Sequence, residues 1–412
     1  MDGRQRMTTN AERLELRRKR MAESLPILRG GFRPFFLGSA AWAIGALAVW
    51  LAIFFGQASP PFRGDPLAWH RHEMLFGFVG AAIAGFALTA VPNWTGRLPI
   101  AGWPLAALFV FWAAGRLLAF LVGPQSVLLI GIDGGFYLLL AALLGREIIQ
   151  SGNRNLPVVA IIALFGVANL GDRIAMGGIA DPGPLDWRAG LALVILLIGV
   201  IGGRIIPSFT RNWLTTNGIR EALPTQPDTF DKLVPAATSI ALILWLLLPF
   251  SPATGAVLLL TAAAHWLRLV RWQGWRCWSN PLLIVLHVGY VWLPIGLFLL
   301  ALAQFAIVAE SSAIHALSAG AMTTMILAVM SRASLGHTGR PLVAGPIATA
   351  AFALVTLAAA ARVIAALSSR DQTILLMLAG IGWFGGFGLF LFEYGPILCK
   401  GRADERLKEA AP

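Results

Sequence analysis

Twelve long apolar runs constrain this chain more than any other feature of its sequence. They cover residues 32–55, 68–91, 101–122, 124–149, 157–178, 187–209, 232–249, 252–273, 280–307, 311–332, 344–366 and 372–397. About 20 apolar residues in a helix cross a bilayer, and lipid offers no partner for backbone N–H and C=O groups. We therefore predict an all-α fold, a polytopic integral membrane bundle of about 12 transmembrane helices.

The composition supports a membrane protein and argues against a nucleic-acid partner. The 412 residues are 57% hydrophobic and only 13% charged, which excludes an ordinary soluble domain. The net charge of +12 is concentrated at both ends and in the connections after the even-numbered spans, where Arg97, Arg204, Arg271 and Arg340 lie. This distribution follows the positive-inside rule, so we predict that both termini are cytoplasmic and that the surroundings are membrane lipid.

The chain divides into one large domain with short ends. We predict a basic cytoplasmic arm at residues 1–24, a single transmembrane domain at 25–398 and a cytoplasmic tail at 399–412. The arm lacks the apolar core of a signal peptide. No clean internal repeat is apparent, which disfavours a secondary transporter. Cys277 and Cys399 are isolated, so neither a disulfide nor a thiolate site is expected.

A cluster of polar side chains opens the second span, in the segment from Trp69 to Met74. His70, His72 and Glu73 would cost several kcal/mol at a membrane boundary unless a metal or a haem bound them. On a regular helix the two histidines point about 200° apart. Either the first turn is unwound and both bind one metal, or each serves a different centre on opposite sides of the helix.

The other histidines extend this candidate metal-binding set. His315 is expected near the outer face with His70 and His72, while His265 lies in mid-membrane and His287 approaches from the cytoplasmic side. Imidazole suits haem iron, copper and zinc. The alternative for each is a histidine satisfied by hydrogen bonds. By contrast, His337 lies in a predicted cytoplasmic loop and is expected to anchor it.

Three arginines are expected near the outer side of the bundle. Arg71, Arg116 and Arg173 could hold haem propionates bidentately, or they could pair with Asp133 and Asp172 at similar depth.

Two residues are candidate catalytic proton carriers. Glu73 could relay protons, orient an imidazole or pair with a buried arginine, and Tyr290 could donate a proton or anchor its helix at the interface. Asp133 and Glu393 are further relay candidates. Met322, like Met74, is a possible soft ligand for copper(I), although helical methionines more often pack.

Several stretches together resemble the NnrS family, across residues 26 to 397. They are Gly31–Phe36, His70–Met74, Ala90–Arg97, Gly203–Thr210, Leu286–Tyr290 and His315–Pro341. The resemblance implies a twelve-span bacterial inner-membrane protein that contains haem and copper and is linked to nitric oxide stress. It does not assign roles to individual histidines.

Three functions follow as expectations. The first is binding of nitric oxide at a His-ligated centre with b-type haem and copper, and its reduction to nitrous oxide with electrons from a quinol or a cytochrome. The second is non-catalytic binding, sensing or metal protection. The third is a secondary transporter, which needs no chromophore.

Overall fold

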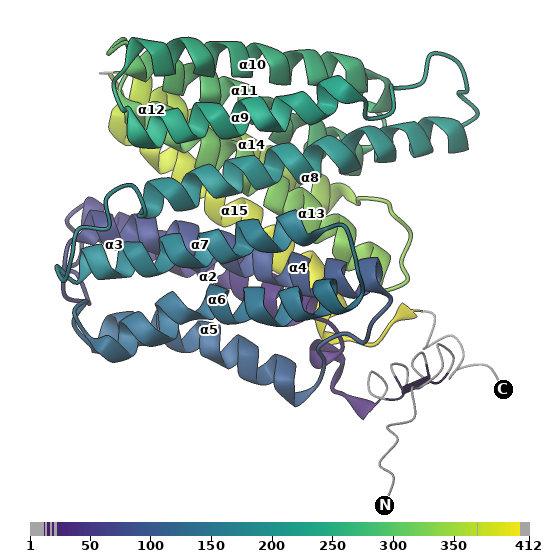
Figure 1. Cartoon of the computed structure of the whole chain (residues 1–412), viewed down its shortest axis with the longest axis horizontal. Helices are drawn as coiled ribbons and strands as arrows, with labels where there is room; N and C mark the ends of the chain where they lie inside the picture. Colours follow the sequence, from purple (N-terminus) through teal and green to yellow (C-terminus); the bar gives the residue numbers. More distant parts are fainter. Residues whose placement is uncertain (1–11, 13–14, 17–18, 20–22, 369, 404–412) are drawn as a thin grey trace, which may run out of the picture.

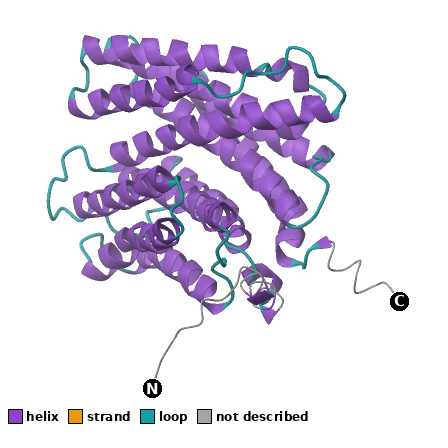
Figure 2. Ribbon diagram, turned by 45° about the vertical axis from the view of Figure 1, so that its right-hand side comes forward, coloured by secondary structure: helices purple, strands orange, loops and turns teal. Residues whose placement is uncertain are grey.

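The described part of the chain is entirely helical in its regular structure. The computed structural model describes residues 12, 15–16, 19, 23–368 and 370–403, so most of the predicted arm and tail lies outside the described residues. Within them, twelve helices are long and apolar enough to cross a membrane (Figures 1 and 2). The predicted all-α class and number of spans are confirmed, and every predicted span overlaps one of these helices.

The helices form three consecutive units of four. The first unit contains α2 (Phe32–Phe54), then α3 (Pro66–His72), η2 (Glu73–Val79) and α4 (Gly80–Thr95) as one continuous span, then α5 (Trp103–Leu121) and α6 (Val127–Gln150). The second contains α7 (Leu156–Met176), α8 (Trp187–Thr216), α9 (Thr229–Leu247) and α10 (Pro252–Trp272). The third contains α11 (Pro281–Gln304), then α12 (Glu310–His315), η4 (Ala316–Met322) and α13 (Thr323–His337) as one span, then α14 (Pro346–Leu367) and α15 (Gln372–Cys399).

Corresponding helices recur at nearly constant spacing along the chain. The first helices begin at residues 32, 156 and 281, the second at 66, 187 and 310, the third at 103, 229 and 346, and the fourth at 127, 252 and 372. The second spans contain 30, 30 and 28 residues. No clean repeat is apparent in the residues themselves, whereas the order and spacing of the helices recur three times along the described chain.

A shared packing contact supports this relation between the first and third units. In each unit the second span contains a π-helix, η2 or η4, and the fifth residue of that π-helix is a glycine facing a tryptophan of the preceding helix. A Cβ on Gly77 would lie 2.6 Å from Trp42 Nε1, and a Cβ on Gly320 would lie 2.6 Å from Trp292 Cδ2. Only glycine allows either close approach.

The three units close into a ring around their second spans. The fourth helix of each unit packs on the first helix of the next, α6 on α7 and α10 on α11, and α15 packs back on α2. The second spans contact one another inside this ring, with α8 crossing the middle of the view in Figure 1. Arg33 of α2 donates to the carbonyl oxygens of Leu398 and Lys400, each at 2.7 Å, so the first and last spans meet at the same end of the bundle.

Candidate functional site: a cavity lined by histidine and arginine

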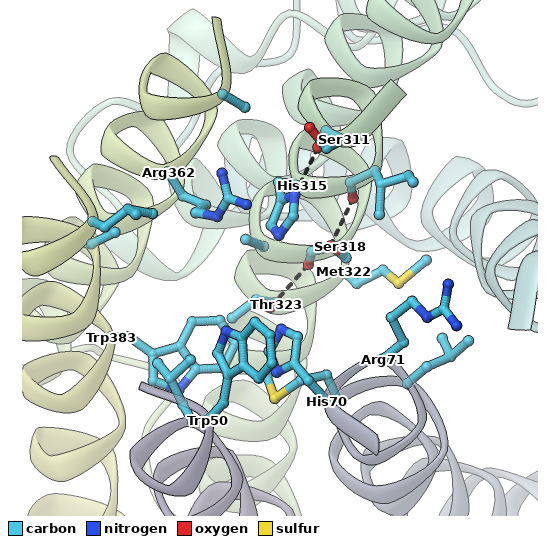
Figure 3. Close-up of a pocket in the computed structure, with 18 of the residues that line it drawn as sticks. Trp50, His70, Arg71, Ser311, His315, Ser318, Met322, Thr323, Arg362 and Trp383 are labelled. Carbon is cyan, nitrogen blue, oxygen red and sulfur yellow. Dashed lines mark hydrogen bonds between the residues drawn. The ribbon is translucent and has the colours of Figure 1, made fainter. Parts of the chain in front are cut away.

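A cavity of about 670 Å³ lies between the first and third units. Its walls come from α2, α3, η2, the start of α8, α12, η4, α14 and α15. The aromatic side chains Trp50 and Trp383 face it together with His70 and His315 (Figure 3), and Trp187 also lines it. The cavity therefore combines flat apolar walls with nitrogen donors in an otherwise apolar bundle.

His70 is held against one wall by stacking. Its ring lies on that of Trp50 with 4.4 Å between the centroids and 14° between the planes. Its Nδ1 is buried and has no hydrogen-bond partner among the described residues. An unsatisfied buried ring nitrogen costs free energy unless something binds it, so His70 is a candidate ligand.

His315 faces the same cavity from α12 in a ligand-ready tautomer. Its Nδ1 lies 2.7 Å from the carbonyl oxygen of Ser311, one turn earlier, and a carbonyl only accepts. Nδ1 must therefore carry the proton, which leaves the Nε2 lone pair available. A backbone carbonyl that fixes the ring in this way is the usual support of a metal-bound histidine.

Two arginines of the cavity lining have no ion-pair partner among the described residues. Arg71 lies over the ring of Trp187, with 4.8 Å from Cζ to the centroid, and its Nε is buried without a hydrogen-bond partner among the described residues. Arg362 of α14 lines the cavity beside His315 (Figure 3), and no described carboxylate pairs with either guanidinium. A third arginine, Arg188, is neutralised because it pairs with Glu310 at 3.3 Å.

These residues fit a haem better than a small ion. The volume lies within the range of about 300–1,000 Å³ typical of cofactor sites. Two imidazoles face the cavity, and two unpaired guanidiniums match the two propionate groups of one haem. No group of three or more His, Cys, Asp or Glu side chains in the described chain is placed to hold a metal ion.

The structure separates His72 from His70. His72 is fully buried, with Nδ1 2.6 Å from Asp172 Oδ2 and Nε2 2.8 Å from Asp133 Oδ2. Both ring nitrogens of His72 are therefore used in hydrogen bonds to carboxyl groups, and neither is available to a ligand. The two rings of the His-x-His pair therefore lie in different surroundings, His70 at the cavity and His72 between two aspartates.

Arg116, Arg173 and Glu73 complete this buried cluster. Arg116 pairs with Asp133 and, at 3.0 Å, with Glu73, and Arg173 pairs with the same two carboxylates. Two arginines and His72 thus face three carboxyl groups in a buried site. The geometry is that of the pairing alternative for both arginines and for Glu73, and none of the six residues lines the cavity.

His265 and Tyr290 belong to a third polar site, between α10 and α11. Arg268 Nη1 donates to the Tyr290 hydroxyl at 2.7 Å. The same hydroxyl lies 2.8 Å from His265 Nδ1. His265 Nε2 lies 2.9 Å from Thr238 Oγ1, and that hydroxyl donates to a backbone carbonyl. The consistent direction is Arg268 to Tyr290 to His265 to Thr238, so both nitrogens of His265 are used.

The remaining histidines lie away from the cavity lining. His287 Nε2 lies 3.0 Å from Thr210 Oγ1, and the ring packs closely against Gly274. His337 is the last residue of α13, and its ring packs on Phe32 with 5.5 Å between centroids. The structure thus gathers His70 and His315 but not His72, His265 or His287.

Sequence reasoning missed Arg362, Trp50 and the Arg188–Glu310 pair. Arg362 is the only charged residue in the apolar run 344–366. An ionisable residue inside a membrane span is a functional candidate by default, so this signal was present. Trp50 carried no such signal, because tryptophan is frequent in this chain.

The fold and this cavity define a class: a polytopic helical membrane protein whose bundle contains a cavity lined by histidine, arginine and tryptophan. The chain belongs to the NnrS protein family, whose model matches residues 26–402. A search of curated proteins found no match to the chain. Family membership relates it to the nitric oxide stress response.

Proposed function

We propose that the cavity holds one haem and that the protein binds nitric oxide there. One observation carries the proposal: His70 and His315, each with an available ring nitrogen, share a cavity with two unpaired arginines. One of these two imidazoles would bind the haem iron, which would leave a coordination position free for nitric oxide, and Arg71 and Arg362 would hold the propionates. The haem would supply an iron position for nitric oxide, which is uncharged and reaches the bundle through lipid.

The protein residues have defined tasks in this proposal. The Ser311 carbonyl fixes the His315 tautomer, Trp50 fixes the His70 ring, and the aromatic walls exclude water. Reduction of two molecules of nitric oxide to nitrous oxide and water consumes two electrons and two protons. Glu310 is the one carboxylate among the described lining residues, and it is our candidate for the proton path although it pairs with Arg188 and accepts from Trp245 Nε1 at 2.9 Å. A quinol or cytochrome is the electron donor.

One observation favours a second function, stoichiometric binding of nitric oxide without turnover. Glu73 and Tyr290, the two proton carriers expected from the sequence, are both committed to hydrogen-bond networks outside the cavity lining. A sensor or metal-protecting protein requires no proton path. Copper remains an expectation of the family resemblance, and we assign it no step.

The decisive experiment is a reduced-minus-oxidised spectrum of the detergent-purified protein, with metal analysis, followed by addition of nitric oxide under reducing conditions. Haem with sustained consumption of nitric oxide supports the enzyme, and haem with one stoichiometric binding event supports the sensor. Absence of haem refutes the proposal and favours a transporter. The recurring order of helices in the three units is compatible with a transporter.

Variants then test the ligands. His70→Ala and His315→Ala are each expected to shift or abolish the Soret band. His337→Ala is the matched control, because His337 lies at the opposite end of the His315 span. A wild-type spectrum in both cavity variants would show that the haem lies elsewhere.

A further inference from the structure

A second cavity lies where the three second spans meet. Its volume is about 90 Å³, and its lining comes mainly from η2 and α4, α8, and η4 and α13, one span from each unit. Every described lining residue is apolar, including Ala82, Ile198 and Met325. We call it the central cavity.

The chemistry of this lining restricts what the central cavity can hold. A buried water needs two to four polar partners, and cavities lined by aliphatic and aromatic side chains stay dry but bind small apolar molecules such as xenon. The volume of about 90 Å³ is several times the roughly 10–15 Å³ that one water-sized molecule requires. This space is too small for a haem, and it suits a diatomic gas.

The central cavity adjoins the cavity of His70 and His315. Val79 and Met322, the last residues of η2 and η4, line both. A single layer of side chains therefore separates the two spaces. Met322 has three rotatable bonds and a soft thioether, so it can change rotamer to let a small molecule pass.

We propose that the central cavity is a binding site for small apolar gas molecules, from which nitric oxide passes Met322 into the His70 cavity. The identity of the gas rests on the proposed function, whereas the existence of an apolar gas site does not. The lining is drawn from all three units, so the site is a product of the repeat and not of any one helix pair.

Xenon tests the site itself, with or without haem. We expect wild-type crystals under xenon pressure to show xenon between α4, α8 and α13, and Ala82→Leu crystals to lack it, because Leu fills the space. The control is Ala107→Leu, which adds the same atoms on an exposed face of α5 and should leave xenon binding unchanged. Absence of xenon from the wild type refutes the site even if Ala82→Leu does not fold.

Flash photolysis of the nitric oxide complex tests delivery. We expect Ala82→Leu to rebind nitric oxide from solution on the order of tenfold more slowly than wild type, with an unchanged Soret band. Ala107→Leu should rebind at the wild-type rate. Wild-type rebinding in Ala82→Leu would refute delivery through the central cavity. If no haem is present, the proposed function fails while the xenon result alone decides the gas site.

Discussion

Replacement of Arg362 by Gln is the sharpest test of the proposed cofactor site. The variant removes one of two unpaired guanidiniums from the cavity while it keeps the Cβ–Cγ–Cδ stem and a polar, uncharged end. A hydrogen bond to a charged group contributes about 1.5–3 kcal/mol, and each 1.4 kcal/mol is tenfold in affinity. Since Arg362 is half-buried, we expect haem affinity to fall about 10- to 100-fold, towards the lower part of that range.

The assay is titration of haem-depleted protein in detergent with haemin, followed at the Soret band. Arg332→Gln is the control, because Arg332 is also half-buried but lies over Phe209, with 4.0 Å from Cζ to the ring centroid, and does not line the cavity. Arg71→Gln should resemble Arg362→Gln. Haem affinity that is unchanged in both cavity variants would refute the pairing of these arginines with propionates.

Three other results are expected from the same structure. His72→Gln should keep the haem spectrum but lower the free energy of unfolding by about 3–5 kcal/mol, because it breaks a buried ion pair; a lost Soret band would instead make His72 a ligand. Tyr290→Phe should lower the free energy of unfolding by about 1–3 kcal/mol, because it leaves His265 Nδ1 unsatisfied, and the protein should unfold at a lower temperature. A change in the haem spectrum would contradict this structural role of Tyr290. Burial raises the pKa of the Cys277 thiol, so an impermeant maleimide at pH 7 should label the exposed Cys399 faster than Cys277. Labelling of Cys399 from the periplasmic side would overturn the predicted cytoplasmic tail.

The span positions were predictable because lipid imposes one rule on every segment, a length of apolar helix. The opposite directions of His70 and His72 also followed from helical geometry. The partners of His72 did not, because Asp133 and Asp172 come from helices whose neighbours are set by three-dimensional packing. The π-helices η2 and η4 were equally hidden, since the contacts of Gly77 and Gly320 with tryptophans join separate helices.

The three polar sites occupy equivalent places in the repeat. Each lies beside the second span of one unit, with side chains from its third and fourth helices and from the first helix of the next. Arg116, Asp133 and Asp172 fill these positions after the first unit, Asp231, Arg268 and Tyr290 after the second, and Arg362, Trp383 and Trp50 after the third.

This equivalence explains why one imidazole is available and another is not. His72 and His315 both immediately precede a π-helix, but His72 meets two carboxylates where His315 meets a cavity walled by tryptophan. Two of the three inter-unit sites are closed by internal charge and hydrogen-bond pairing. The third site contains an unpaired arginine and a cavity. The cavity is therefore explained by tryptophans standing where the first site has carboxylate partners, and not by loose packing. A carboxylate partner for Arg362 should therefore close the cavity. In Ala358→Asp, the new carboxylate lies one turn before Arg362 on the cavity lining, so it should compete with the haem propionates and weaken haem binding. The control Leu357→Asp places the same group at an exposed position and should not weaken haem binding.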